Sequence, residues 1–172
     1  MVKSFTVDHT NMKAPDIRIA EEIPVGRQNK IVKFDIRFKR PYKDDPMYPA
    51  RMHSIEHMMA TAIREISQAT IIDFSPMGCR TGFYLTVLNP PENFVTNDIK
   101  GAMIISLDMD EVPGADKKSC GNCYYHDIDD AKRELLDFLD FGGIDEKLHV
   151  CSLSDCRVLT PYLCPLRAGA ID

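Results

Sequence analysis

Residues 52–66 constrain the fold more than any other segment, because their helical periodicity separates apolar from polar side chains. On a helical wheel with about 100° per residue, one side of the expected helix is apolar and the opposite side is polar. The apolar side carries Ile55, Met58, Met59, Ala62 and Ile66. The polar side carries His53, Glu56, His57, Ala60 and Arg64. This helix therefore needs a core on one side and presents histidine and carboxylate groups on the other.

Three segments predict β-strands. The clearest is 31–38, where apolar residues alternate strictly with charged ones, so that one face is core and Arg37 lies on the other. Two more strands are expected at 70–74 and 83–88. The turn-like sequence Ser-Pro-Met-Gly at 75–78 joins them and indicates a hairpin.

Two further segments predict helices. Residues 127–141 have an apolar helical stripe, and Asp127 at their start is a common N-cap residue. Residues 92–108 fit either a helix or a strand, and the length of the segment favours a helix.

Length, charge and cysteine content exclude several classes of protein. The 172 residues suffice for one domain with a substantial core. The net charge of -5 argues against nucleic acid as a partner, because binding phosphates requires clustered Lys and Arg. No apolar run approaches the roughly 20 residues that cross a bilayer, and no secretory signal is evident, so we expect a cytoplasmic protein without membrane contact. Its six cysteines should stay reduced and serve as ligands, nucleophiles or core residues.

The spacing of His53 and His57 predicts a metal site. Histidines at positions i and i+4 of a helix can bind one metal ion, and Glu56 lies where it can act on a ligand of that metal. A catalytic metal needs a third protein ligand and an open position. Cys120, in a loop-like segment before the last helix, is the best candidate for that ligand. A solvated polar helix face that binds no metal is the simplest competing interpretation.

Other uses of these ligand residues are also open. Cys123 or His126 can replace Cys120 as the third ligand. H-x-x-E-H is also the inverzincin peptidase pattern, in which a downstream glutamate, here Glu134, binds the metal. A non-catalytic zinc site for partner binding can be built from Cys120, Cys123, Cys151 and Cys156.

Cys79 is a second candidate for a reactive group. It follows Gly78 in a tight turn, where a side chain can be presented to a cleft. Arg80 or Arg37 nearby can favour its thiolate form. A buried structural cysteine explains the pattern equally well.

Five segments of the chain resemble one known family. They are SFTVDHTNMKAP near the N-terminus, KFDIRF, HSIEHMMATAIRE, IIDFSPMGCRTGFYLTVL and CGNCYYHDIDDAKREL. Their order and approximate spacing, over about residues 4–140, are similar to those of the S-ribosylhomocysteine lyase (LuxS) family.

The resemblance implies an enzyme that splits S-ribosylhomocysteine into homocysteine and 4,5-dihydroxy-2,3-pentanedione, the precursor of the bacterial signal autoinducer-2. In the family one divalent metal per subunit, Fe²⁺ replaceable by Zn²⁺ or Co²⁺, is bound by residues that match His53, His57 and Cys120. The family's acid/base residues match Glu56 and Cys79. Two metal-assisted isomerisations move the sugar carbonyl along its chain before a β-elimination releases homocysteine.

The resemblance also implies how the substrate is bound. Arg64 and Asp73 match residues for the carboxylate and ammonium of the homocysteine half, with Phe74 beside them. A surface ion pair between Arg64 and Asp73 is the competing interpretation. Ser4 and His9 match positions that reach the substrate from a neighbouring subunit.

The implied fold is α+β: a single domain with a mainly antiparallel sheet packed with helices in an α/β sandwich, assembled as a homodimer with its active sites at the subunit interface. Arg37 matches an arginine close to the family's reactive cysteine. Residues 1–148 are expected to form the catalytic domain. Residues 149–172, with three cysteines, have no counterpart in the family, and their role is open.

Overall fold

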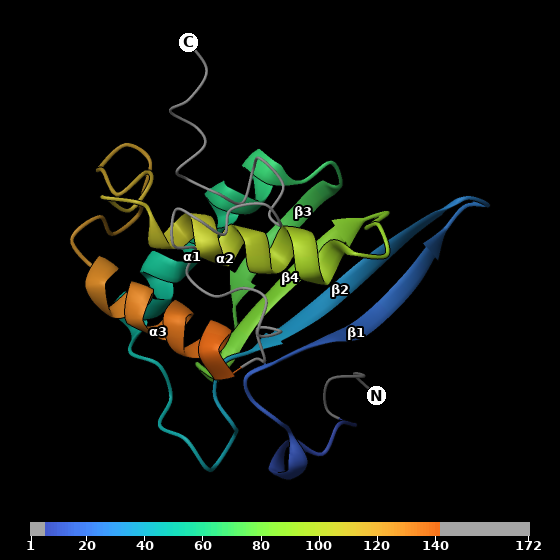
Figure 1. Ribbon diagram of the computed structural model, residues 1–172, viewed down its shortest axis with the longest axis horizontal. Helices are drawn as coiled ribbons and strands as arrows, with labels where there is room; N and C mark the ends of the chain where they lie inside the picture. The colour runs from blue at the N-terminus through green and yellow to red at the C-terminus, as the bar shows by residue number, and fades with distance from the viewer. Residues whose placement is uncertain (1–5, 142–172) are drawn as a thin grey trace, which may run out of the picture.

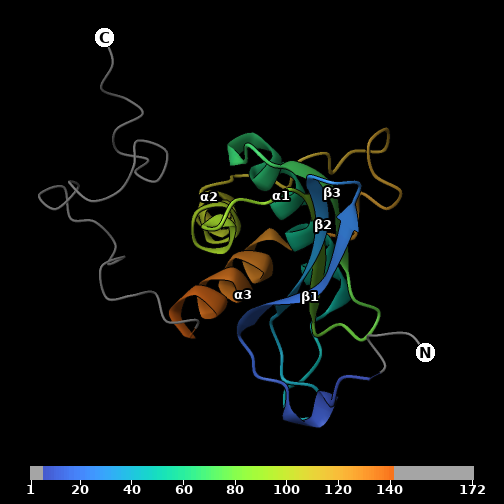
Figure 2. The same cartoon turned by 90° about the vertical axis from the view of Figure 1, so that its right-hand side faces the viewer.

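The computed structural model describes residues 6–141. These form a four-stranded antiparallel sheet with strand order β1-β2-β4-β3 and three α-helices, which lie on one face of the sheet (Figures 1 and 2). The strands are β1 (Asp16–Val25), β2 (Asn29–Arg37), β3 (Thr70–Pro76) and β4 (Gly82–Leu88). The helices are η2 (His9–Asn11), α1 (Pro49–Ile66), η3 (Val95–Ile99), α2 (Lys100–Leu107) and α3 (Ile128–Phe141). A single α+β domain with an antiparallel sheet is confirmed.

Helix α1 has the two faces that its sequence predicts. The side chains of Ile55, Met58, Met59 and Ala62 are fully buried, and the helix packs against α2, α3 and β3. It begins at Pro49, before the expected start at 52. Proline suits the first turn of a helix, because an N–H at this position has no partner within the helix. Burial of the apolar side leaves the histidine side facing away from the core.

The predicted helices at 127–141 and 92–108 are also confirmed. Asp127 caps α3, because its Oδ1 accepts a hydrogen bond from the Asp130 N–H at 2.9 Å. The ambiguous segment is helical: η3 is a π-helical turn that runs directly into α2. No described helix has both the length and the apolar character needed to cross a membrane.

The sheet contains one strand that the sequence did not predict. β1 pairs with β2, but its register shifts between Ile19 and Glu21. An irregularity of this kind breaks the alternation of apolar and polar residues from which strands are recognised. Strand β2, in contrast, places Val32, Phe34 and Ile36 in the core as expected, while Asp35 and Arg37, on its other face, are buried as well.

The β3–β4 hairpin presents Cys79 at its tip. Strand β3 extends to Pro76, so the turn spans 77–81 rather than 75–78, and the Met77 N–H closes it by donating to the Gly82 carbonyl at 2.9 Å. Gly82 lies against β2, where an added Cβ would be only 2.3 Å from the Ile36 carbonyl oxygen. The hairpin can approach β2 this closely only because residue 82 has no side chain.

We therefore expect Gly82→Ala to lower the free energy of unfolding by about 1–3 kcal/mol, because the two strands must move apart. Urea titration followed by circular dichroism measures this loss. Gly78→Ala is the matched control, since a Cβ at Gly78 meets nothing within 4 Å. Equal stabilities of the two variants would contradict the close strand approach.

Candidate functional site

Four potential metal ligands converge beside the polar face of α1: His53, His57, Cys120 and His126. One ligand atom from each lies within 4.8 Å of the others. The Cys120 Sγ is 3.4 Å from the His53 Nε2 and 3.6 Å from the His126 Nε2. Such a group can hold a single metal ion.

The three histidine rings are oriented by oxygen atoms. The Nδ1 of His53 contacts the Tyr125 carbonyl oxygen at 2.9 Å, and the Nδ1 of His57 contacts that of Pro113 at 2.7 Å. The Nδ1 of His126 lies 3.4 Å from the Ser54 hydroxyl. Because each Nδ1 faces an oxygen, the Nε2 atoms remain for a metal.

The loop that carries Cys120 is ordered by Asp116. Its Oδ1 accepts hydrogen bonds from the backbone N–H groups of Lys118 at 2.7 Å and Ser119 at 3.0 Å. These bonds, led by that of Lys118, lower the pKa of the Asp116 carboxyl below its ordinary value. The Cys120 N–H donates to the Asp116 carbonyl at 2.9 Å, which fixes the backbone of this candidate ligand.

Of the three candidates for the third ligand, the structure brings two to the histidine pair. Cys120 and His126 belong to the group, and Cys123 does not. His126 is partly buried, and burial followed by the neighbouring His53 and His57 lowers its pKa below the ordinary value. The four-cysteine alternative depends on Cys151 and Cys156, which lie outside the described residues.

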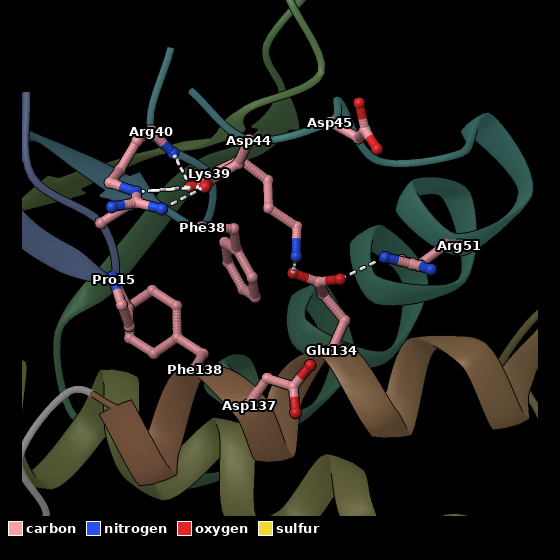
Figure 3. A pocket seen from close by; sticks show the side chains of 11 residues that line it. Pro15, Phe38, Lys39, Arg40, Asp44, Asp45, Arg51, Glu134, Asp137 and Phe138 are labelled. Carbon is pink, nitrogen blue, oxygen red and sulfur yellow. Dashed lines mark hydrogen bonds and ion pairs between the residues drawn. The ribbon is translucent and has the colours of Figure 1, made fainter. Parts of the chain in front are cut away.

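The inverzincin interpretation is wrong, because Glu134 lies elsewhere. Figure 3 shows its carboxylate between Lys39 and Arg51, at the edge of a cavity of about 530 Å³. The Lys39 Nζ is 2.6 Å from the Glu134 Oε1, and Arg51 pairs with the other oxygen. Arg51 also pairs with Asp130 at 2.6 Å. This 3% exposed glutamate links α3 to α1 through its pair with Arg51, and it does not belong to the group of potential metal ligands.

Cys79 lies at the end of a second polar cluster, which Arg18, Asp35, Arg37 and Thr81 complete. Its Sγ is 3.0 Å from the Thr81 hydroxyl and 4.0 Å from the Arg37 Nη1. Asp35 holds the Arg37 guanidinium through two oxygens, at 3.1 and 2.7 Å, and also pairs with Arg18. The thiol is exposed, so the alternative of a buried structural cysteine is wrong.

His9 shares a cavity with this thiol. The cavity has a volume of about 380 Å³, and His9, Cys79 and Thr81 are among its lining residues. The Nδ1 of His9 is 2.8 Å from the Val7 carbonyl oxygen. Ser4, expected to act with His9, lies outside the described residues.

The expected substrate residues occupy different environments. Arg64 is exposed and donates to the Ala60 carbonyl at 2.7 Å, whereas Asp73 is exposed and accepts from the Ser75 hydroxyl at 2.8 Å. Within residues 6–141 the two do not form an ion pair with each other, which removes the competing interpretation. Phe74 is a core residue whose ring stacks on Phe83 with centroids 5.1 Å apart.

Glu56 is partly buried on the polar side of α1, between the two histidines in sequence. It lies one helical turn from Ala60, on the polar side of α1 that the helical wheel predicts. Three supporting groups were not anticipated: the carbonyl groups of Pro113 and Tyr125 and the hydroxyl of Ser54. Of these groups only the Ser54 hydroxyl belongs to a side chain, so only Ser54 could have been noticed in the sequence. It is buried and directly follows His53 on the helix.

Comparison with known proteins assigns the chain to a family. A sequence profile described as S-Ribosylhomocysteinase (LuxS) matches residues 2–147. The chain belongs to the LuxS family. It is 43% identical over 141 residues to an S-ribosylhomocysteine lyase of Helicobacter pylori strain Shi470, covering 81% of this chain and 89% of that one. It is 40% identical over 141 residues to an S-ribosylhomocysteine lyase of Staphylococcus aureus strain bovine RF122, covering 81% and 88%. The LuxS relatives are thus carbon–sulfur lyases.

We expect Cys120→Ala to weaken metal binding by more than the roughly 10–100-fold that loss of a supporting contact costs, because a thiolate ligand is removed. Metal content after anaerobic dialysis against a chelator measures the effect. Cys123→Ala is the matched control and should retain the metal of the parent protein. If Cys123→Ala loses the metal and Cys120→Ala retains it, Cys123 rather than Cys120 is the thiolate ligand.

Proposed function

We propose that this LuxS-family chain is a metal-dependent S-ribosylhomocysteine lyase, which cleaves its substrate to homocysteine and 4,5-dihydroxy-2,3-pentanedione, the autoinducer-2 precursor. The observation that carries the proposal is the convergence of His53, His57 and Cys120 beside the helix face that carries Glu56. Relatives at about 40% identity have this lyase name. The reaction releases a signal precursor and clears a by-product of methyl transfer.

The ligand types support one divalent metal per subunit, Fe²⁺ with Zn²⁺ or Co²⁺ as substitutes. Imidazole and thiolate ligands suit these ions better than Mg²⁺ or Ca²⁺, which prefer oxygen. When bound, the metal supplies a Lewis acid that polarises the sugar carbonyl. His53, His57 and Cys120 would hold it, and the carbonyl groups of Tyr125 and Pro113 would keep the two histidine rings in place.

Glu56 and Cys79 are the proposed proton carriers. Each isomerisation removes a proton from one carbon of the sugar and returns it to the neighbouring carbon, so two groups are needed, one on each side of the substrate. Within the described part of the chain Glu56 has no ion-pair partner, so its carboxylate is available to exchange protons. Arg37, 4.0 Å from the Cys79 sulfur, stabilises negative charge there.

Arg64 and Asp73 are proposed to bind the homocysteine half of the substrate. Arg64 would bind the carboxylate and Asp73 the ammonium. Both charges are available, because Arg64 and Asp73 do not form an ion pair with each other. Asp73 follows a register shift between Ile71 and Asp73 in β3, an edge strand of the sheet. Bulges of this kind re-aim side chains. The buried Phe74 ring supports this part of the strand from the core.

We further propose a cytoplasmic homodimer. Ser4 and His9 of one subunit would reach the substrate bound by the other. The polar side of α1 needs a cover to exclude water from the reacting sugar, and a second subunit would provide it.

We expect Glu56→Gln and Cys79→Ala each to lower kcat by about 10²–10⁴-fold, because each removes a proton carrier while leaving the three metal ligands intact. The assay follows free thiol release from S-ribosylhomocysteine under anaerobic conditions, with metal content measured in parallel. Cys123→Ala is the control. Unchanged thiol release by both metal-loaded variants would contradict the proposed mechanism. Absence of activity in the parent protein would contradict the proposed function.

We expect Arg64→Ala and Asp73→Asn each to lower kcat/KM by about 10–100-fold, the effect of losing a hydrogen bond to a charged group. The loss should appear mainly in KM, because these groups bind a part of the substrate that does not react. Steady-state kinetics over a range of S-ribosylhomocysteine concentrations measures it. Glu65→Ala, an exposed neighbour on α1, is the control and should keep the parent KM.

A further inference from the structure

The Thr81 side chain lies between Arg37 and Cys79, and none of the roles proposed above uses it. Its Oγ1 is 2.5 Å from the Arg37 Nη1 and 3.0 Å from the Cys79 Sγ. Thr81 is only 5% exposed, and a buried hydroxyl group needs partners for both its hydrogen and its oxygen. The two contacts therefore decide how the hydroxyl group of Thr81 is oriented.

Arg37 fixes the direction of both hydrogen bonds. A guanidinium group only donates, so the Thr81 oxygen accepts from the Arg37 Nη1. The hydroxyl hydrogen then needs an acceptor, and within residues 6–141 the Cys79 sulfur is the only other group that the Thr81 hydroxyl contacts. The guanidinium thus donates to the hydroxyl oxygen, and the hydroxyl donates to the sulfur.

A sulfur atom that accepts such a bond is favoured in its ionised form. Hydrogen bonds to an ionised acceptor are roughly twice as strong as those between neutral groups, so the Thr81 hydroxyl stabilises a thiolate more than a thiol. The guanidinium also polarises the hydroxyl to which it donates, which strengthens the second bond. Arg37 itself is 4.0 Å from the sulfur, so Thr81 is the closer of the two donors.

The backbone of the hairpin turn holds Thr81 in this position. The Thr81 carbonyl accepts hydrogen bonds from the N–H groups of Phe38 at 2.9 Å and Lys39 at 3.0 Å, just beyond the end of β2. The preceding residue, Arg80, has a φ of 59°, and its carbonyl accepts from the Met47 N–H at 2.9 Å. A left-handed backbone at a residue other than glycine is strained and persists only where the surroundings hold it. The turn therefore keeps the hydroxyl and the thiol on facing sides of one contact.

We propose that Thr81 is a positioning residue of the lyase, which keeps the Cys79 sulfur ionised and holds it at the cavity of about 380 Å³ that both residues line. The proposal deepens the lyase function and rests on it. When Cys79 removes a proton from a sugar carbon, the proton goes to the sulfur and the electron pair of the broken C–H bond stays with the substrate. The Thr81 hydroxyl keeps its own proton throughout.

Other charged and titratable groups also face the Cys79 sulfur. Burial, then the Asp35 carboxylate and to a smaller extent Cys79, raise the pKa of the Tyr84 phenol above its ordinary value, so this group stays neutral. The titratable residues that line the same cavity are His9, Lys43, Asp44 and Asp45. All these groups are the same in variants of Thr81, so a difference between the variants reports the hydroxyl group.

The test measures the pH dependence of Cys79 alkylation by iodoacetamide in the full-length, metal-loaded protein. Peptide mass spectrometry follows Cys79 separately from the other cysteines. In Thr81→Val, which keeps the shape but loses the hydroxyl, we expect the profile to move to higher pH by about 1–2 units. This shift corresponds to the roughly 10–100-fold effect of losing one hydrogen bond to a charged group. Thr81→Ser should restore the parent profile, and Thr70→Val, the same substitution at an exposed position of β3, should not change it.

Steady-state kinetics gives a second readout that a purely structural role would not produce. Thr81→Val should lower kcat at neutral pH by about 10–100-fold with KM close to that of the parent protein. The loss should become smaller as the pH is raised, because the sulfur then ionises without the hydroxyl. A loss of kcat that is equal at every pH would overturn the proposal.

Two results of the alkylation experiment would also overturn it: a Thr81→Val profile equal to that of the parent, or an equal shift in Thr81→Val and Thr81→Ser. If Thr81→Val does not fold, NMR of the parent protein decides. The Cβ resonance of Thr81 should then shift with the same pH midpoint as Cys79 alkylation, and a resonance independent of pH would contradict the hydrogen bond.

Alkylation needs no substrate, so the role of Thr81 and the lyase function can fail separately. A displaced Thr81→Val profile in a protein without lyase activity would reject the proposed function and keep the hydrogen bond from Thr81 to the thiolate. Lyase activity in the parent protein together with an unmoved Thr81→Val profile would reject only the role of Thr81.

Discussion

The burial of one side of α1 is the interaction on which the rest of the structure depends. Ile55, Met58, Met59 and Ala62 are completely buried in the core that the sheet, α2 and α3 share. A helix is rigid over this length, so burial of these residues also sets the direction of the opposite side. The two histidines at i and i+4 are consequently held by the same packing energy that stabilises the domain.

The other potential metal ligands come from the loop between α2 and α3. Its backbone carbonyl groups, at Pro113 and Tyr125, contact the two α1 histidines. Gly114 has a φ of 66°, a conformation that glycine adopts without strain, so the chain can turn directly after Pro113. The loop therefore adds Cys120 and His126 to the group of potential metal ligands and, through its main chain, also orients the two histidines of the helix.

Sequence periodicity predicted those helices and strands whose apolar residues recur at a regular spacing along the chain. α1, α3, β2 and the β3–β4 hairpin were predicted because their apolar spacing follows the helix or strand period, whereas the register shift in β1 hid that strand. The histidine pair was predicted for the same reason. Cys120 and Cys123 were not separable, because loop residues have no period. The support from Pro113 and Tyr125 was not predictable, since every residue has a carbonyl group.

The second cluster shows how the sheet directs charge toward Cys79. Asp35 is fully buried beside two arginines, and its carboxylate takes up the Nε and Nη2 of Arg37. Only the Nη1 of Arg37 is left to face the hairpin, where it contacts Thr81 and the Cys79 sulfur. Because Arg18 adds a second cation to the same carboxylate, the cluster has an excess positive charge at its thiol end. Gly82, the residue of β4 that pairs with Arg37, allows this close approach, because an added Cβ there would lie 2.3 Å from the Ile36 carbonyl oxygen.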